Sequence, residues 1–177
     1  MLIPTALASD MIDATEGAVD GHIAMMKLGN AISSYIMKNA MIMFGWVGIF
    51  TPPPPAPPIP DAIIIATGKI QGIMISLTQS GATAQPAALM ALATQIRTGV
   101  AMGLYMPDAP WSCSPGSMAT IPPLSLSLAG NNRQMVFLSL ATQICTWIQT
   151  FIPTVPCAGT HTVGVPYIGT ATPTVIL

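Results

Sequence analysis

Residues 89–98 read LMALATQIRT, residues 137–146 read FLSLATQICT, and the two stretches agree at six of ten positions. The matching apolar residues are Leu92 and Ile96 in the first stretch, and Leu140 and Ile144 in the second. A spacing of four residues puts such a pair on one face of a helix, and the threonines and glutamines between them form an uncharged opposite face. The two stretches therefore predict amphipathic helices over residues 86–103 and 132–151.

A second match extends this similarity into a repeat. Pro60-Asp61-Ala62 recurs 47 residues later as Pro107-Asp108-Ala109, in the same order relative to the helical stretches. Two ordered matches at nearly one offset favour a duplicated unit of about 47 residues, which would have a Pro-Asp turn, a variable middle, a loop containing Gly81 or Gly130, and a helix. The expected ranges are about 60–106 and 107–153 for the two units, and 61–159 for the region that holds them.

The segments before the repeat differ from it in composition. Residues 1–50 contain no proline after Pro4 and are rich in Ala, Met and Ile, which predicts one or two helices with breaks at Gly21 and Gly29. Residues 51–60, TPPPPAPPIP, are unsuited to a helix or a sheet interior and predict a polyproline II spacer. The expected fold class is mainly α: a helical domain with a polyproline spacer, the duplicated unit and an extended C-terminal arm.

The C-terminal arm, residues 160–177, alternates β-branched residues with glycine and proline. It has too little apolar bulk to offset the conformational entropy of ordering its backbone, about 1–2 kcal/mol per residue. We expect the arm to leave its own subunit and to pair with a neighbour, which would supply the missing hydrogen bonds and apolar cover. The predicted interface residues are Val163, Val165, Tyr167, Ile168, Val175, Ile176 and Leu177.

Charged residues are scarce throughout the chain. They make up 6% of its 177 residues, whereas 51% are apolar, and ordinary soluble domains have roughly 25% charged residues. A free monomer of this composition would expose Ser, Thr, Gln, Ala and Met, with little charge to keep copies apart. The thirteen methionines fit covered surfaces, because a flexible thioether fills gaps in cores and at subunit interfaces. We therefore expect much of the surface to be buried against other subunits.

The charged residues that are present indicate no nucleic-acid partner. Five Lys and Arg residues are scattered singly, and phosphate binding needs several clustered ones. The one charge cluster is an acidic row whose spacing would align it along the first helix near the positive end, and its members are Asp10, Asp13, Glu16 and Asp20. A cation or a basic partner is one reading of this row. Because the Asp/Gly spacing of a calcium loop is absent, we expect a solvated helix face without a specific metal.

Groups suited to catalysis are also scarce. His22 and His161 are the only side chains that ordinarily titrate near neutral pH, and neither belongs to a catalytic motif. Cys113, Cys145 and Cys157 are an odd number without CxxC spacing, which indicates small buried residues rather than a disulfide framework or a zinc site. No dinucleotide fingerprint, P-loop, zinc-protease motif, serine-hydrolase elbow or EF-hand loop occurs. The sequence therefore predicts a protein that is not an enzyme, with no catalytic residue, cofactor or metal.

A small multi-pass membrane protein is the main alternative, because four windows are apolar enough to resemble spans: 31–50, 62–79, 84–106 and 134–153. Three windows contain a basic residue, which costs about 2.5–3.5 kcal/mol at a bilayer centre. The fourth has a Thr/Gln face that suits a protein interior, so we expect no membrane partner. The second alternative is a soluble binding module that uses the polyproline segment.

In general character the chain resembles the small structural proteins of tailed-bacteriophage particles. The resemblance rests on scarce charge, on abundant Ala, Thr, Pro and Met, and on an extended C-terminal arm, and it spans the whole length without a motif. It implies a virion component of the tail, neck, baseplate or capsid, assembled in the host cytoplasm. The implied partners are copies of the chain itself and other structural subunits, and no residue receives a role from this resemblance.

Overall fold

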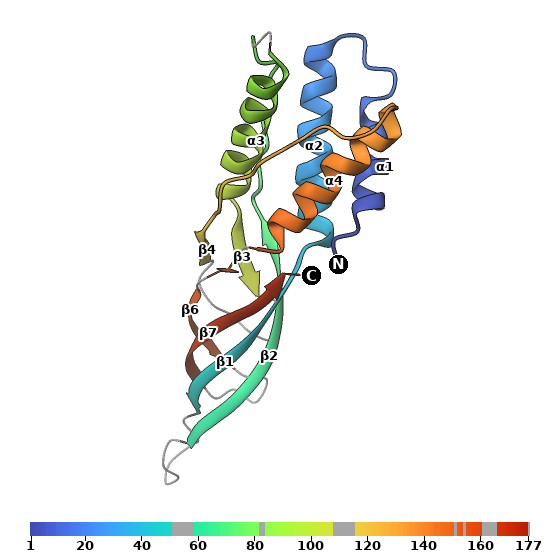
Figure 1. Cartoon of the computed structure of the whole chain (residues 1–177). Helices are drawn as coiled ribbons and strands as arrows, with labels where there is room; N and C mark the ends of the chain where they lie inside the picture. Colours follow the sequence, from blue (N-terminus) through green and yellow to red (C-terminus); the bar gives the residue numbers. More distant parts are fainter. Residues whose placement is uncertain are drawn as a thin grey trace.

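The structure is a computed structural model that describes residues 1–50, 59–81, 84–107, 116–150, 152–153, 155–160 and 166–176. Side chains are described for residues 1–43, 67–81, 84–105 and 121–150. Most of the expected polyproline spacer lies outside these ranges, as do Val163, Val165 and Leu177. Helices gather at one end of the molecule, and long strands extend away from them at the other end (Figure 1).

The described residues form four helices: α1 (Pro4–Thr15), α2 (Gly21–Asn39), α3 (Gln85–Ala101) and α4 (Arg133–Ile148). Side-chain caps begin two of them. The Asp20 carboxylate accepts the Ile23 N–H at 2.8 Å before α2, and Asn132 Oδ1 accepts the Met135 N–H at 2.9 Å before α4. Proline occupies the first turn of α1 and of α3, where its missing N–H costs no helical hydrogen bond. The two helices expected from the matching stretches are therefore confirmed, and each ends two or three residues earlier than predicted.

The described strands form one antiparallel sheet in the order β5-β4-β3-β2-β1-β7-β6. Its strands are β1 (Met41–Phe50), β2 (Ile59–Gln71), β3 (Leu104–Pro107), β4 (Gly116–Thr120), β5 (Ile152–Pro153), β6 (Val155–Thr160) and β7 (Pro166–Ile176). The helical prediction for residues 1–50 is wrong after Asn39, because MIMFGWVGIF is rich in the aromatic and β-branched residues that favour strands. Pairing with β2 on one side, from Met41↔Lys69 to Phe50↔Ile59, and with β7 on the other satisfies the backbone of β1.

The described part of the C-terminal arm, residues 160 and 166–176, is extended, as predicted, and it is part of this sheet. Within the chain, β7 pairs with β1 from Ile42↔Ile176 to Phe50↔Tyr167, and β6 pairs with the other edge of β7. The predicted interface residues Tyr167, Ile168, Val175 and Ile176 all lie in β7. Pairing of this arm with a neighbouring subunit stays a prediction about the assembly.

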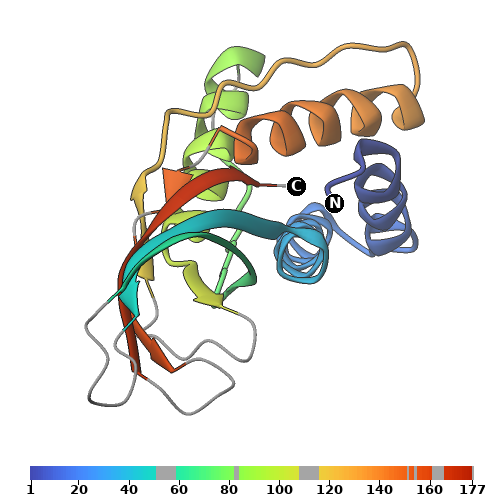
Figure 2. The same cartoon turned by 90° about the horizontal axis from the view of Figure 1, so that it is seen from below.

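Two extended segments lie among the helices and are named here by their residues. Strap 1, residues 72–81, joins β2 to α3, and strap 2, residues 121–130, joins β4 to α4. Strap 1 contacts α2 on one side and α3 on the other, whereas strap 2 lies between α3 and α4. Helix α1 packs on both α2 and α4. Strap 2 runs along the outside of the helices in both views (Figures 1 and 2).

The core lies where the helices and strap 1 meet. Three helices contribute the same apolar spacing, namely Leu28, Ile32 and Ile36 in α2, Leu92, Ile96 and Val100 in α3, and Leu140, Ile144 and Ile148 in α4. Strap 1 adds Ile73, Ile75 and Leu77, which alternate with exposed residues as expected of an extended chain with one buried face. Most of the buried apolar side chains described are helical, and the mainly α expectation is confirmed to that extent.

Candidate interaction surfaces

Strap 1 is held on both sides by backbone and small residues. The Ile75 N–H donates to Ser33 Oγ of α2 at 3.1 Å, and the Met74 N–H donates to the Gly99 carbonyl of α3 at 3.3 Å. A Cβ at Gly29 would lie 2.4 Å from the Ile75 carbonyl oxygen, and one at Gly99 would lie 2.5 Å from the Met74 carbonyl oxygen. Gly29 was expected to break the helix, but it lies buried inside α2, where the strap needs the space of its missing side chain.

A glutamine in each matching stretch binds the strap that precedes its own helix. Gln95 Oε1 accepts the Thr78 N–H at 2.9 Å, and its Nε2 donates to Thr78 Oγ1 at 3.1 Å. Gln143 Oε1 accepts the Ser127 N–H at 2.8 Å, and its Nε2 donates to the Ser127 carbonyl at 2.9 Å. The uncharged helix face recognised in the sequence therefore includes a backbone-binding glutamine. Sequence reasoning missed this role because the partner lies 16 or 17 residues away in an irregular segment.

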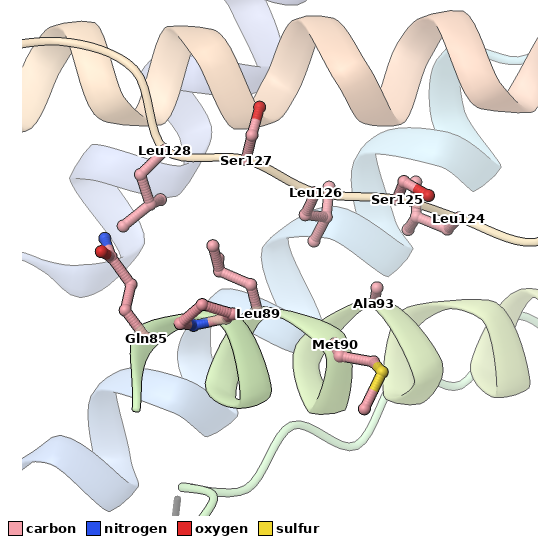
Figure 3. A pocket seen from close by; sticks show the side chains of 10 residues that line it. Gln85, Leu89, Met90, Ala93, Leu124, Ser125, Leu126, Ser127 and Leu128 are labelled. Atoms are coloured by element: carbon pink, nitrogen blue, oxygen red, sulfur yellow. The ribbon is translucent and has the colours of Figure 1, made fainter. Parts of the chain in front are cut away.

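Strap 2 is held at its beginning and at Ser127. The Arg97 guanidinium donates to the Ile121 carbonyl at 3.0 Å, and Trp147 Nε1 donates to the Pro122 carbonyl at 3.0 Å. Between strap 2 and α3 lies a cavity of about 400 Å³, lined by Gln85, Pro86, Leu89, Met90, Ala93 and residues 124–128 (Figure 3). Along the strap, Leu124 is buried, Leu126 is half-buried and Leu128 is 41% exposed. Strap 2 is therefore seated less fully than strap 1.

A second cavity, of about 540 Å³, adjoins the first at Gln85, Leu89 and Leu128. Side chains from α2, α3, α4 and both straps line it, and the apolar ones are Met25, Ala88, Leu89, Leu92, Leu128 and Leu140. The polar lining consists of uncharged groups from Thr78, Gln79, Ser80 and Gln85. Its size suits a small ligand, but no charged group or buried unpartnered polar atom in its described lining selects one.

Large apolar side chains are exposed over the helical end. Six of them are methionines, each at least 49% exposed: Met1, Met26, Met74, Met90, Met102 and Met135. Single exposed apolar residues are ordinary on protein surfaces. Here they accompany exceptionally few charged residues, so most of the surface offers apolar or uncharged polar groups to a partner.

The acidic row does not lie at the positive end of one helix, and that expectation is wrong. Asp10 and Asp13 lie in the second half of α1, Glu16 caps its C-terminal end, and Asp20 caps α2. The chain turns between the helices at Gly17, whose φ of 65° is accessible to glycine at little cost. Arg133 partly compensates the negative end of α1. Its guanidinium donates to the Ile12 carbonyl at 3.1 Å and to Thr15 Oγ1 at 2.7 Å.

The described groups with chemical reactivity lie apart from one another. Burial raises the pKa of the Cys145 thiol to about 11, which makes the thiolate scarce near neutral pH. The Tyr35 hydroxyl accepts the Ile3 N–H and donates to the Ile3 carbonyl, and burial raises its pKa. His22 is exposed, whereas His161 and Cys113 lie outside the described residues. Within the described ranges, no group of three or more His, Cys, Asp or Glu residues is placed to hold a metal ion.

None of the helices described has the combined length and hydropathy of a membrane-spanning helix. No protein-family model matches the sequence, no curated protein is significantly similar to it, and no solved structure significantly matches its fold.

Proposed function

We propose that this chain is a non-enzymatic structural subunit of a large protein assembly, namely a virion component of a tailed phage, in its tail, neck, baseplate or capsid. The observation that carries the proposal is the exposed surface of the helical end, where methionines and uncharged polar groups occur with very few charges. Methionine-rich surfaces adapt to partners, and low charge removes the repulsion that keeps soluble copies apart.

The composition of the sheet supports the same proposal. Residues of a strand alternate between its two faces, and β1 contains only apolar residues and glycine. An antiparallel sheet with one face in water normally has polar residues on that face. Part of the sheet extends beyond the helices in Figure 1. Neighbouring subunits would provide the cover that such a sheet requires.

The native mass of the purified chain tests the assembly. In detergent-free buffer, sedimentation velocity over a range of concentrations should show species many times heavier than the 18.4 kDa chain. A monomer at every concentration would overturn the proposal, and solubility only in detergent would favour the membrane alternative.

The virion assignment needs its own test. Antibodies against the chain should decorate one defined part of purified phage particles in electron micrographs. If the pure chain assembles but no particle is labelled, the proposal of a structural subunit would stand and the assignment to a virion would be wrong.

A further inference from the structure

We infer that the outer edge of strap 2 pairs antiparallel with the same edge of a second copy of this chain. The edge consists of the backbone N–H and C=O groups of Leu124, Leu126 and Leu128. This inference rests on the proposed assembly function and specifies one of its interfaces.

The hydrogen bonds of strap 2 leave this edge free. Ser127 directs both its N–H and its C=O toward Gln143 of α4. In an extended chain, adjacent residues direct these groups to opposite sides, so those of Leu126 and Leu128 belong to the other edge. No described residue forms a hydrogen bond with a backbone group of Leu124, Leu126 or Leu128. Such groups are satisfied by water until another strand replaces it.

The position of strap 2 makes the edge reachable. The strap lies on the outside of the helices in both views (Figures 1 and 2), and Ser125 and Ser127 are exposed. The close view shows leucine side chains directed toward α3, and Ser127 directed toward α4 (Figure 3). The strap therefore already has the two-faced form of a strand, with an apolar face toward its own helix.

The sequence of the edge identifies a second copy as the occupant. Residues 124–128 read LSLSL, which is symmetric about Leu126. Antiparallel pairing centred on Leu126 places Leu124 opposite Leu128 and Ser125 opposite Ser127. The leucine pairs are then the hydrogen-bonded pairs, and each exchanges two hydrogen bonds. Leucine meets leucine and serine meets serine around a two-fold axis, which is the self-complementarity that an isologous interface requires.

Strap 1 is not an equivalent candidate. Its Ile75 N–H already donates to Ser33, and helices α2 and α3 contact its backbone from both sides. The cavity beside strap 2 also leaves its leucines room to adjust when a second strand pairs with them. The predicted contact is therefore specific to strap 2.

Charge placed on the serines tests the register. The double variants Ser125→Glu/Ser127→Glu and Ser125→Lys/Ser127→Glu both disturb Ser127 in the same way, so they differ only in the charge at residue 125. In the proposed register the first opposes like charges at both serine pairs, and the second opposes unlike charges. Sedimentation equilibrium should give about a tenfold weaker self-association for the Glu/Glu variant, because each cross-strand charge pair contributes several tenths of a kcal/mol or more.

A disulfide test is independent of charge. Directly opposite residues bring their Cβ atoms to about 4.5–5.5 Å, whereas diagonal neighbours lie about 7–8 Å apart, and a disulfide suits the shorter separation. Oxidation of a mixture of Ser125→Cys and Ser127→Cys chains should therefore give cross-linked dimers. Either variant alone should give no more cross-linking than the wild-type chain, which controls for the native cysteines.

The outcomes separate this inference from the proposed function. A wild-type chain that stays monomeric overturns both. A wild-type chain that assembles, while the two double variants associate equally and the cysteine mixture gives no excess of dimers, overturns strap pairing alone.

Discussion

Straps 1 and 2 occupy corresponding places before a helix, and a glutamine of that helix holds each one, yet they are seated differently. Along the shared apolar spacing of α2 and α3, Gly29 and Ser33 of α2 correspond to Ala93 and Arg97 of α3. The small residues let strap 1 contact the α2 backbone, whereas Ala93 lines a cavity of about 400 Å³ beneath strap 2. Small differences between the supporting helices thus make strap 1 a segment of the core and leave strap 2 with an open edge.

Filling the space at Gly29 should produce the largest effect. In Gly29→Ala the new Cβ would lie 2.4 Å from the Ile75 carbonyl oxygen. Strap 1 could accommodate it only by moving its backbone. Overpacking of this kind costs about 3 kcal/mol, and the better helix propensity of alanine returns about 1 kcal/mol. Urea denaturation should show a net loss of about 2 kcal/mol in the free energy of unfolding.

Gly81→Ala is the matched control, because a Cβ at Gly81 meets no atom within 4 Å. Its free energy of unfolding should stay within about 0.5 kcal/mol of the wild type. Equal stabilities of the two variants would show that strap 1 does not require the space at Gly29.

Removing the Ser33 hydroxyl should have the next largest effect. Ser33 is buried, and its Oγ accepts the Ile75 N–H while donating to the Gly29 carbonyl at 2.9 Å. Ser33→Ala leaves the Ile75 N–H without this partner, at a cost of about 1–2 kcal/mol. The exposed neighbour supplies the control, since Ser34→Ala should leave the denaturation midpoint nearly unchanged; a midpoint for Ser33→Ala equal to that control would contradict the assignment.

Replacing the two glutamines should reveal the difference between the two straps with a smaller loss of stability. Gln143→Leu removes both hydrogen bonds to the Ser127 backbone, and Gln95→Leu removes one to the Thr78 backbone. Each should cost about 1 kcal/mol of stability. Amide exchange should accelerate across strap 2 in the first variant but only around Thr78 in the second, because Ser33 and Gly99 still hold strap 1. Equal acceleration of both straps would remove the difference between them.

The smallest effect is expected at Cys145. In a Cys113→Ser/Cys157→Ser background, a thiol reagent at pH 8 should label Cys145 slowly, because burial raises its pKa to about 11. Adding Gln143→Leu should leave the labelling rate unchanged, since residues two apart on a helix face different directions. Fast labelling of this variant would show that strap 2 shields Cys145 from solvent. That result would contradict the peripheral position of strap 2.

Residues with a local periodic signal were predictable from the sequence, and residues defined by distant neighbours were not. The spacing of Leu140 and Ile144 predicts α4. In contrast, Met41–Phe50 follows a helix directly and becomes a strand only through pairing with β2 and β7. The role of Gln143 depends on Ser127, which lies 16 residues away in an irregular segment. The buried Gly29 shows the same limit, because its requirement for space arises from Ile75, far along the chain.

Hydrogen–deuterium exchange at single-residue resolution tests the central claim most directly, namely that strap 1 is sealed within the chain and strap 2 is completed by a second copy. The Leu124, Leu126 and Leu128 amides should exchange rapidly in dilute solution and become protected as the chain associates. The Ile75 amide, bound to Ser33, should be protected in both conditions. Slow exchange at Leu126 in the monomer, or equally fast exchange before and after association, would contradict the account.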